Sequence, residues 1–383
     1  MKNILIINSL KRFDQSLLNL FSDLGRNRSL FGWLGEKVSL EKFKEIGPAK
    51  KIFLGPKARG PVNFLAFIFL APMLWAGYFF NLYFFSRKQK IGKIICVGFR
   101  EKIIFTPLAR FLKLAVVWLE LPGAGEQKGK FFSVFLRFFS DPVEIVVFTA
   151  PDAVGLAEMG FKKEQINNIS LGINLHAVER QDNIFYNLAK ADKPYSFYKN
   201  FTVGTVVGPN DCRRLELLLQ AAKNCLNFIP NFRLVVIGTV PENSNLNWLV
   251  KKMGLDSRVW LVGEQKNPLQ WFADFDLYIA LQENPGLSDL EMILLVASRG
   301  VPLAAFREKN IFDIIVEGRT GFWIKKDSAE ALGQKIIEIE SDQRFCRAVG
   351  ENGKEMVCAH FDRKKQIKRL EEIIDKNLYS KSI

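Results

Sequence analysis

Short and almost wholly apolar runs recur along this chain, and helix-like stretches of ten or more residues separate most of them. Near-continuous apolar strands joined by helices are typical of parallel sheets that are covered on both faces. The pattern therefore predicts an α/β fold of the doubly wound kind. The expected strands are Ile4–Ile7, Ile94–Gly98, Ala115–Leu119, Ile145–Phe148, Phe201–Val207, Leu234–Gly238, Val259–Gly263, Leu277–Leu281 and Leu303–Phe306.

The doubly wound pattern occurs twice, which predicts two domains. A chain of 383 residues is longer than one hydrophobic core usually supports. Residues 177–200 are polar and aperiodic, so we expect the linker there. The expected domains are residues 1–190 and 191–355. Residues 356–383 are predicted to form a basic amphipathic helix that packs back on the N-terminal domain.

The chain is strongly basic, with 54 Lys and Arg residues against 40 Asp and Glu residues and a net charge of +14. This charge favours anionic partners such as nucleic acid, acidic lipid or phosphorylated ligands. Nucleic acid is the weaker of these readings, because the basic residues are spread among acidic ones and no recognition motif occurs. We therefore expect no nucleic-acid partner.

Cysteine and histidine usage argues against disulfide and metal chemistry. The five cysteines are scattered and never have C-x-x-C spacing, so neither a disulfide framework nor a zinc site is indicated. Only His176 and His360 are present, which excludes a histidine-rich metal site. We expect no metal, no cofactor and a reducing cytoplasm. The start of the chain, MKNILIINS, suits a buried first strand better than a signal peptide.

Residues 60–86, GPVNFLAFIFLAPMLWAGYFFNLYFFS, contain no charged residue and are long enough to cross a bilayer as a helix. Pro72 and Gly77 interrupt the segment, and basic residues flank both ends, whereas a spanning helix usually has its basic excess on one side. A broken helix that lies in or dips into the cytoplasmic leaflet satisfies both flanks. A buried helical hairpin is the alternative. We expect contact with an anionic membrane surface through this segment.

The stretch QENPGLSDLEMILLVASRGVP holds Glu283 and Glu291, a Pro-Gly turn and an apolar helix. Its SDLE sequence is a capping box, in which Ser288 is the N-cap residue and Glu291 reaches back to the N-cap backbone. A helix that begins there points free N–H groups and its positive dipole end at an anion. The backbone of Gly286, Leu287 and Ser288 is therefore a predicted anion site.

Several more candidate residues lie where the expected strands of the second domain end. Ligands of doubly wound sheets bind beyond the carboxyl ends of the strands. Gly208, Gly238, Gly263 and Gly286 fall at or near these ends, although a glycine also marks any tight turn. We therefore expect the ligand to bind along this edge of the sheet.

From Ile169 to about Ile336 the order of elements resembles the retaining glycosyltransferases of family 4. NISLGIN looks like the family's Val-Ile-Pro-Asn-Gly-Val-Asp element, and VWLVGEQKNPLQWFADFDLYI looks like its Gly-bearing strand followed by the Ala-Asp strand. GVPLAAF and VEGRTGFWIKKDSAEAL resemble the segments that close the domain. Upstream, the similarity is only architectural. The resemblance implies a GT-B fold, in which two doubly wound Rossmann-like domains flank an interdomain cleft.

The resemblance also implies that the C-terminal domain binds a nucleotide-diphosphate sugar. Glu283 and Glu291 have the family's E-x7-E spacing, in which the first carboxylate contacts the sugar and the second contacts the ribose. A solvated loop charge is the alternative for Glu283. Glu291 lies about one helical turn, roughly 6 Å, farther from the following Gly-x-Pro than in the family, so ribose contact and helix cap both stay open for it. The base is expected near Gly263 and Glu264.

Family members place an Arg and a Lys after the first strand of the second domain, where they stabilise the leaving diphosphate. In this chain Gly208 stands near the place of that Arg, and Arg213 or Arg214 near that of the Lys. Residues one apart on a helix face different ways, so at most one arginine is expected to reach the phosphate, and we favour Arg213. A solvated helix start is the alternative for both.

The first domain departs further from the family, because its first loop has no glycine and its middle strand no histidine. That strand instead ends in Glu120, which is either a polar active-site group or the cap of a turn. His176 is expected to lie exposed in the linker. The predicted catalytic residues are therefore Arg213, Glu283 and Glu120.

The function that the resemblance implies is transfer of a hexose, with retention, from a nucleotide-diphosphate sugar. The acceptor would be a lipid-linked or envelope saccharide at the inner face of the cell membrane, held by the N-terminal domain. The alternative is a degenerate, non-catalytic GT-B protein that scaffolds a membrane-associated assembly. The missing Arg, the missing His and the displaced Glu291 favour that alternative.

Overall fold

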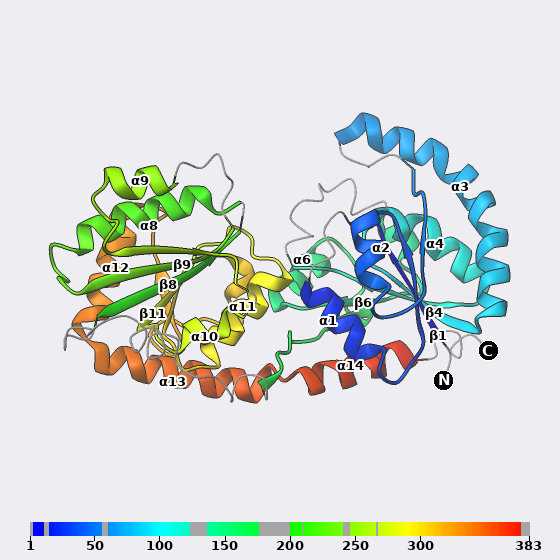
Figure 1. The fold of residues 1–383 in the computed structure, drawn as a ribbon. Helices are drawn as coiled ribbons and strands as arrows, with labels where there is room; N and C mark the ends of the chain where they lie inside the picture. Colours follow the sequence, from blue (N-terminus) through cyan, green and yellow to red (C-terminus); the bar gives the residue numbers. More distant parts are fainter. Residues whose placement is uncertain are drawn as a thin grey trace. The chain divides into compact units, whose positions relative to one another are not determined.

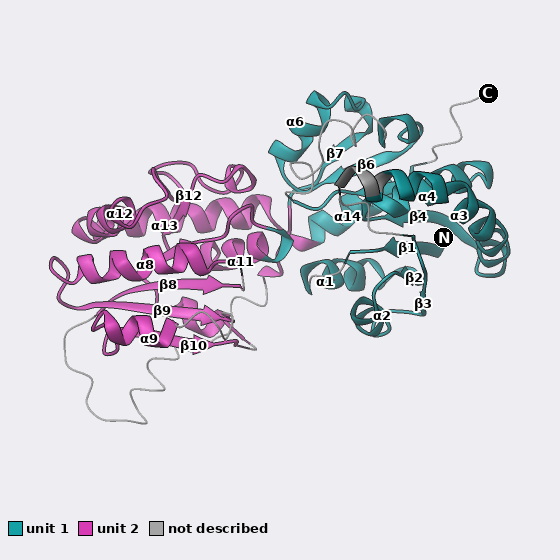
Figure 2. Ribbon diagram, turned by 90° about the horizontal axis from the view of Figure 1, so that it is seen from above, with its two compact units in different colours: residues 1–170, 286–288, 364–383 teal, residues 171–285, 289–363 magenta. Residues whose placement is uncertain are grey.

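The computed structural model describes residues 3–10, 15–55, 60–122, 136–175, 200–208, 210–239, 246–265 and 267–376. The chain forms two compact units (Figures 1 and 2). The first unit comprises residues 1–170, 286–288 and 364–383, and the second comprises residues 171–285 and 289–363. The predicted linker, apart from Asn200, and His176 lie outside the described residues.

The first unit is built on a seven-stranded parallel sheet in the order β3-β2-β1-β4-β5-β6-β7. The order reverses between β1 and β4, which pair directly. Buried aliphatic residues fill β1 and β4, as the apolar runs predict. The strands are β1 (Asn3–Asn8), β2 (Leu30–Leu34), β3 (Ala49–Lys51), β4 (Ile91–Cys96), β5 (Ala115–Leu119), β6 (Glu144–Val147) and β7 (Ile166–Asn168).

Helices follow most of these strands, and α3 and α4 pack together on the sheet. Phe67 and Leu82 of α3 and Phe105 of α4 share one buried cluster with Ile7 and Ile94. The helices are α1 (Gln15–Leu24), α2 (Lys37–Phe43), α3 (Gly60–Lys88), α4 (Phe99–Phe111) and α6 (Ala150–Glu158), with a 3-10 turn at Lys163–Gln165.

The second unit is built on a six-stranded parallel sheet in the order β10-β9-β8-β11-β12-β13. Its strands are β8 (Phe201–Val207), β9 (Phe232–Gly238), β10 (Val259–Gly263), β11 (Leu277–Ala280), β12 (Leu303–Phe306) and β13 (Phe322–Ile324). Helices α8 and α12 pack closely, with Gly333 against Ala221. The helices are α8 (Cys212–Cys225), α9 (Leu246–Lys252), α10 (Leu269–Phe272), α11 (Leu287–Ala297), α12 (Ala329–Ser341) and α13 (Gln343–His360), with a 3-10 turn at Lys309–Ile311.

The charge-free segment forms α3, one helix of 29 residues with Pro72 inside it (Figure 1). The predicted break is therefore not found, and the alternative of a buried hairpin is wrong. A proline inside a helix removes one backbone hydrogen bond and clashes with the carbonyl of residue i−4, at a cost of about 3 kcal/mol, which tertiary contacts can offset. We attribute the continuity of α3 to its contact with the core of the unit, since Phe67, Ala71 and Leu82 are buried on both sides of the proline.

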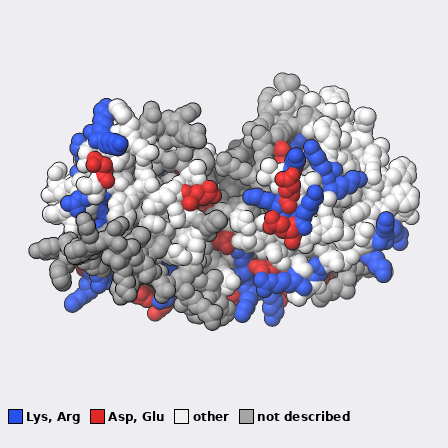
Figure 3. Space-filling view, viewed as in Figure 1, with Lys and Arg blue, Asp and Glu red and all other residues white. Residues whose placement is uncertain are grey.

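The opposite side of α3 is apolar and exposed. The part of α3 from Leu65 to Lys88 is long and apolar enough to cross a membrane, yet only 17% of its apolar stretch is buried in the protein. In Figure 3 the surface where α3 runs is largely without charge, whereas elsewhere on this face Lys and Arg lie beside Asp and Glu. We call the exposed side the apolar face, and its large residues are Leu65, Phe69, Leu70, Met73, Phe80 and Phe84.

Helix α14 (Arg363–Asp375) groups with the first unit from Lys364 onward. Its residues Leu370, Ile373 and Ile374 are buried, in the helical spacing that the sequence shows. At its end, the Asp375 carboxylate accepts hydrogen bonds from both terminal nitrogens of Arg28, at 2.8 and 2.5 Å. These contacts tie the C-terminal helix to the first unit.

We expect Asp375→Asn to remove part of the pH dependence of folding stability. The hydrogen bond from Arg28, with the nearby charges of Arg28 and Lys93, lowers the pKa of Asp375 from 3.8 to about 2. A lowered folded-state pKa stabilises the fold above about pH 4, and this contribution disappears as the pH falls toward 2. Urea unfolding between pH 5 and pH 2 should therefore give a steeper loss for the wild type than for the variant. Parallel curves would contradict the assignment.

Candidate functional site

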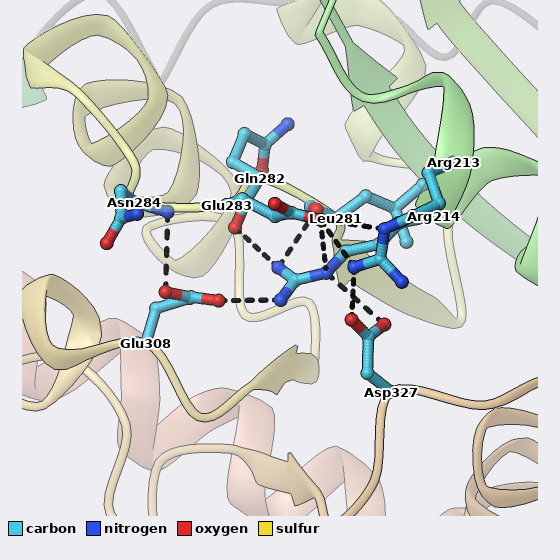
Figure 4. A network of polar contacts seen from close by, with 8 residues as sticks. All are labelled: Arg213, Arg214, Leu281, Gln282, Glu283, Asn284, Glu308 and Asp327. Atoms are coloured by element: carbon cyan, nitrogen blue, oxygen red, sulfur yellow. Dashed lines mark hydrogen bonds and ion pairs between the residues drawn. The ribbon is translucent and has the colours of Figure 1, made fainter.

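The sheet of the second unit has a topological switch point between β8 and β11. From this pair, β9 and β10 continue in one direction and β12 and β13 in the other. Ligands of open parallel sheets bind at the carboxyl ends of the strands at such a point. Here the segments after β8, β11, β12 and β13 bring Arg213, Glu283, Glu308 and Asp327 together with Arg214 (Figure 4).

Arg214 is the buried member of this cluster, with 8% of its side chain exposed. Its Nη1 donates to the carbonyl oxygens of Leu281 and Gln282, at 3.2 and 2.8 Å. Its Nη2 donates to Glu308 at 2.6 Å, and the guanidinium lies 4.3 Å from the ring centre of Phe306. Arg214 therefore supports the loop that follows β11. Its predicted contact with a donor stays a prediction.

Arg213, by contrast, has 56% of its side chain exposed. Its guanidinium donates to the carboxylates of Asp327 and Glu283, and its Nε lies 3.1 Å from Glu283 Oε1. Hydrogen bonds to Asp327 and then Glu283 raise the pKa of Arg213 above its ordinary value. The two adjacent arginines thus differ as their helix position predicts, and Arg213 is the one that a solvent-borne ligand can reach.

The loop after β11 holds Glu283 at the start of α8. Asn284 has a left-handed backbone, with φ +50°, and its N–H donates to Glu308 at 3.3 Å. The Gln282 side chain donates to the carbonyl of Val206 at 2.6 Å. These contacts hold the loop on both sides of Glu283, and its carboxylate accepts hydrogen bonds from Arg213. The predicted sugar contact of Glu283 is chemically consistent with this position and stays a prediction.

The start of α11 differs from the predicted capping box. The helix begins at Leu287, so Ser288 lies inside it and Gly286 precedes it. Leu287 is buried, and residues 286–288 group with the first unit, where the Ser288 hydroxyl lies 3.1 Å from that of Ser16. The capping-box prediction is therefore wrong, because the helix starts before the serine.

Glu291 does not cap the helix either. Its Oε1 accepts a hydrogen bond from Nη2 of Arg363 at 2.7 Å, and the two side chains are 14% and 9% exposed. The Glu291 carboxylate therefore pairs with Arg363 and not with the backbone N–H at the start of α11. The ribose contact stays a prediction, and a ribose would share the carboxylate with Arg363.

Three predicted glycines end strands or begin the loops after them. Gly238 has φ +117°, and a Cβ there would meet the carbonyl oxygen of Val207 at 2.0 Å, so only glycine fits. The N–H of Gly208 donates to Asp211 at 2.7 Å, and burial raises the pKa of that carboxyl. Gly263 has φ +70° and open space at its Cβ. Glu264 follows it, 3.5 Å from the Thr239 hydroxyl.

At the switch point of the first unit, Glu101 joins the ends of β1 and β4. Its carboxylate accepts from the N–H and the hydroxyl of Ser9, at 2.9 and 2.7 Å, and from the N–H of Gly98. Glu101 is fully buried and was not predicted as a site residue. Its signal was the Gly98-to-Glu101 spacing, which places a glutamate three residues after an N-cap position.

Glu120, the predicted catalytic residue of the first unit, is paired with a buried lysine. It follows β5, and its Oε1 lies 2.6 Å from Nζ of Lys102, with the two side chains 7% and 0% exposed. Its backbone N–H donates to Val146 at 2.9 Å. The alternative prediction, that Glu120 caps a turn, does not include this ion pair. A catalytic role for Glu120 stays a prediction.

Among the described residues, no three His, Cys, Asp or Glu side chains are grouped as metal ligands. The carboxylates at the switch point of the second unit are instead engaged by arginine. Glu308 and Asp327 were not predicted from the sequence, since they lie 94 and 114 residues from their arginine partners. In the sequence, the feature that marks Glu308 and Asp327 as candidates is that each lies shortly after a short apolar run.

Residues 210–356 match the sequence model of the family described as glycosyl transferases group 1. The match overlaps the segment on which the sequence resemblance rests, and it confirms that resemblance there. It includes α8 with both arginines, the loop after β11 and the whole of α11.

Two curated relatives are similar over part of the chain. An N-acetyl-alpha-D-glucosaminyl L-malate synthase from Bacillus anthracis is 25% identical over 189 residues, which is 49% of this chain and 46% of the relative. The capsular polysaccharide biosynthesis glycosyltransferase CapM from Staphylococcus aureus is 21% identical over 244 residues, which is 60% of this chain and 62% of the relative. The matches thus span about half to three fifths of these relatives.

The fold as a whole is similar to that of Alr3699/HepE from Anabaena, whose crystal structures contain UDP or UDP-glucose. The complex with UDP has a TM-score of 0.76 at 14% identity and covers 97% of this chain and 98% of that chain. This likeness confirms the predicted GT-B fold with its two parallel sheets.

Proposed function

We propose that this protein is a retaining glycosyltransferase that moves a hexose from a nucleotide-diphosphate sugar to a lipid-linked or envelope saccharide. The observation that carries the proposal is the exposed Arg213 beside Glu283 at a topological switch point, within the segment that matches the glycosyltransferase family. The similarity to a capsular polysaccharide glycosyltransferase supports an acceptor of the cell envelope.

The chemistry of transfer gives each group a role. When the bond between sugar and diphosphate breaks, the electron pair leaves with the diphosphate, and negative charge grows on its oxygens. Arg213 would neutralise that charge, together with the backbone N–H groups of Gly286, Leu287 and Ser288 at the positive end of α11. Glu283 would accept hydrogen bonds from sugar hydroxyls. In this proposal the stabilisation comes from these groups without a metal ion.

We infer that UDP is the first nucleotide to test, because the structurally similar Anabaena protein binds UDP and UDP-glucose. The base would lie near Gly263 and Glu264. Retention of anomeric configuration would follow from displacement on a single face of the sugar. Nuclear magnetic resonance of the product anomer tests this part directly.

One observation favours the second candidate, a non-catalytic scaffold. Arg213 and Arg214 supply two positive charges, whereas Glu283, Glu308 and Asp327 supply three negative ones. An incoming diphosphate must therefore compete with Asp327 and Glu283 for the guanidinium of Arg213. A donor sugar that binds to Glu283 would release Arg213 from that carboxylate. In a scaffold protein, Arg213 would stay paired with Glu283 and Asp327.

A thermal-shift panel separates the two candidates. We expect one of the UDP, GDP or ADP sugars, at about 100 times its Kd, to stabilise the protein by roughly 2.7 kcal/mol. The corresponding nucleoside monophosphate is the control, since it lacks the diphosphate. A panel in which no nucleotide sugar shifts the unfolding temperature would support the scaffold.

The apolar face of α3 supports a peripheral position on the inner face of the membrane. The residues packed on the core hold α3 along the first unit, and Arg87, Lys88 and Lys90 follow its exposed apolar side chains. Apolar side chains in the headgroup region with cations beside anionic lipid are typical of interfacial helices.

Replacing Phe69, Met73, Phe80 and Phe84 together with serine is expected to weaken vesicle binding by at least about a hundredfold, because each side chain contributes roughly 1 kcal/mol or more of transfer free energy at the interface. Cosedimentation with phosphatidylglycerol vesicles measures this. Phe228→Ser with Trp248→Ser, two exposed apolar residues of the second unit, is the matched control. Equal loss in both variants would contradict the assignment.

A further inference from the structure

A groove of about 570 Å³ lies in the first unit between α3 and the segment that follows β3. Its volume is within the range of roughly 300–1,000 Å³ that small-molecule sites occupy. Apolar and aromatic side chains make most of its wall, including Trp33, Ile52, Leu74 and Tyr78. The groove therefore has the size and lining of a site for an apolar ligand.

The wall of the groove is held in place before any ligand binds. The Tyr78 hydroxyl donates to the carbonyl of Phe53 at 2.6 Å and accepts from the N–H of the same residue at 3.0 Å. The ring of Trp33 packs on that of Tyr78, with centroids 6.2 Å apart. A preformed cavity lowers the ordering cost of binding.

Two lysines at the groove have no partner among the described residues. Lys50 and Lys51 line the groove and are exposed, and neither makes an ion pair or side-chain hydrogen bond with a described residue. Two cations beside an apolar wall favour a ligand that carries anionic oxygen as well as an apolar body.

The groove opens within the apolar face of α3. Leu70 and Met73 line the groove and also belong to the apolar face, and Met73 is 75% exposed. Phe53, on the other side of the groove, is 72% exposed. A chain could therefore pass from a membrane leaflet into the groove without crossing water.

At Gly55 the groove comes close to the carboxyl ends of the strands of the first sheet. Gly55 lines the groove, and its carbonyl accepts a hydrogen bond from Nη1 of Arg100 at 2.7 Å. Arg100 is next to Glu101, which joins the carboxyl ends of β1 and β4. This end of the groove is therefore near the edge where doubly wound sheets bind substrates.

We propose that this groove binds the hydrocarbon chain of a phosphate-bearing membrane lipid, with Lys50 and Lys51 at the phosphate. The charge of the two lysines complements the phosphate, and the apolar wall complements the chain. The further step, that this lipid carries the sugar acceptor, rests on the proposed function. The proposal that the groove binds a lipid does not depend on that function.

Gly77 offers a variant that fills the groove without disturbing the fold. It lies in α3 and lines the groove, and a Cβ at this position would meet no atom within 4 Å. A leucine there would project into open space, and helix interiors favour leucine over glycine by roughly 0.5–1 kcal/mol. Gly77→Leu should therefore fold, while Gly77→Ala adds only a methyl group and is the matched control.

Calorimetric titration with farnesyl phosphate below its micellar concentration tests the site. We expect Gly77→Leu to lower the affinity at least tenfold and Gly77→Ala less than twofold. Lys50→Gln with Lys51→Gln should weaken farnesyl phosphate about tenfold and leave farnesol unchanged. Equal affinity of Gly77→Leu and wild type would overturn the proposal, as would inorganic phosphate that binds as tightly as the lipid.

The role of the lipid as acceptor carrier needs a separate readout. Gly77→Leu adds apolar surface to α3, so it should keep vesicle binding and donor-induced thermal shift while losing transfer to a lipid-linked acceptor. If farnesyl phosphate binds but no sugar is transferred by the wild type, the groove stands and the proposed function fails. If transfer occurs and Gly77→Leu leaves it unchanged, the groove assignment fails alone.

Discussion

Replacing Arg213 with alanine is expected to lower kcat for sugar transfer about 100- to 1,000-fold. Preorganised charge at the leaving group is commonly worth a factor of this size, because it acts on charge that develops only in the transition state. The side chain is half exposed and supports no buried group, so stability should change little. Steady-state kinetics with saturating donor measures the loss.

Lys223→Ala is the control for this substitution, since Lys223 is exposed near the other end of the same helix, roughly 15 Å along its axis from Arg213. It should keep kcat within about twofold. Arg213→Lys retains the charge without the fork of the guanidinium, and we expect it to recover part of the rate. A kcat for Arg213→Ala equal to that of Lys223→Ala would show that Arg213 does not act on the leaving group.

Replacing Lys102 with methionine is expected to destabilise the first unit by about 3–5 kcal/mol. The substitution leaves the Glu120 carboxylate buried without its cation, and an uncompensated buried charge has a cost of this order. Urea unfolding of the full chain, followed by fluorescence, measures the free energy of unfolding.

The double variant Lys102→Met with Glu120→Leu removes both charges and should recover most of the lost stability. Recovery would show that the cost comes from the orphaned carboxylate and not from lost packing. Turnover of the double variant then tests the predicted catalytic role of Glu120: a stable but inactive protein supports it, and an active one leaves the ion pair as structure alone. A double variant no more stable than Lys102→Met would contradict the ion-pair account.

The strands that the sequence predicts correctly are those with long buried aliphatic runs. All nine expected strands are present. Eight of them lie inside the two sheets, where both faces of a parallel strand are buried and the composition is therefore uniform. The ninth, β10, is a half-buried edge strand that its apolar composition still marks. The missed strands, β2, β3, β7 and β13, are short or mixed. β3 has three residues, two of them lysine, and Gly32 interrupts β2 because a Cβ there would collide with Phe43.

The site was predictable only where the chain order resembles a known family. Arg213 and Glu283 were singled out on that resemblance, and the fold brings them into contact across 70 residues. Asp327, the second partner of Arg213, follows β13, a strand too short to be expected. Its approach to α8 depends on the order of strands in the sheet, which local sequence does not encode.

The capping prediction failed for a similar reason. SDLE fits a capping box by spacing, but α11 starts at Leu287, and Glu291 finds Arg363, 72 residues away. Glu291 and Arg363 are both largely buried, and leaving either charge unpaired would cost about 3–5 kcal/mol, more than the roughly 1 kcal/mol of a local cap. Tertiary contact therefore decides the role of this glutamate.

The apolar segment was ambiguous because its residues are apolar on every side. Composition alone fits a core helix, an interfacial helix and a spanning helix equally. The structure separates the faces: Phe67 and Leu82 are fully buried, whereas Phe69 is 82% exposed. The separation of a buried side from an exposed side supports an interfacial helix. Residues of the same helix also form one wall of the groove for which lipid binding is proposed.

The most direct test of the account is a crystal structure of the protein with UDP. We predict that the diphosphate contacts the Arg213 guanidinium and the backbone N–H groups of Gly286, Leu287 and Ser288, with the Arg213 to Asp327 contact broken or lengthened. A diphosphate bound elsewhere, with Arg213 still paired to both Glu283 and Asp327, would contradict it.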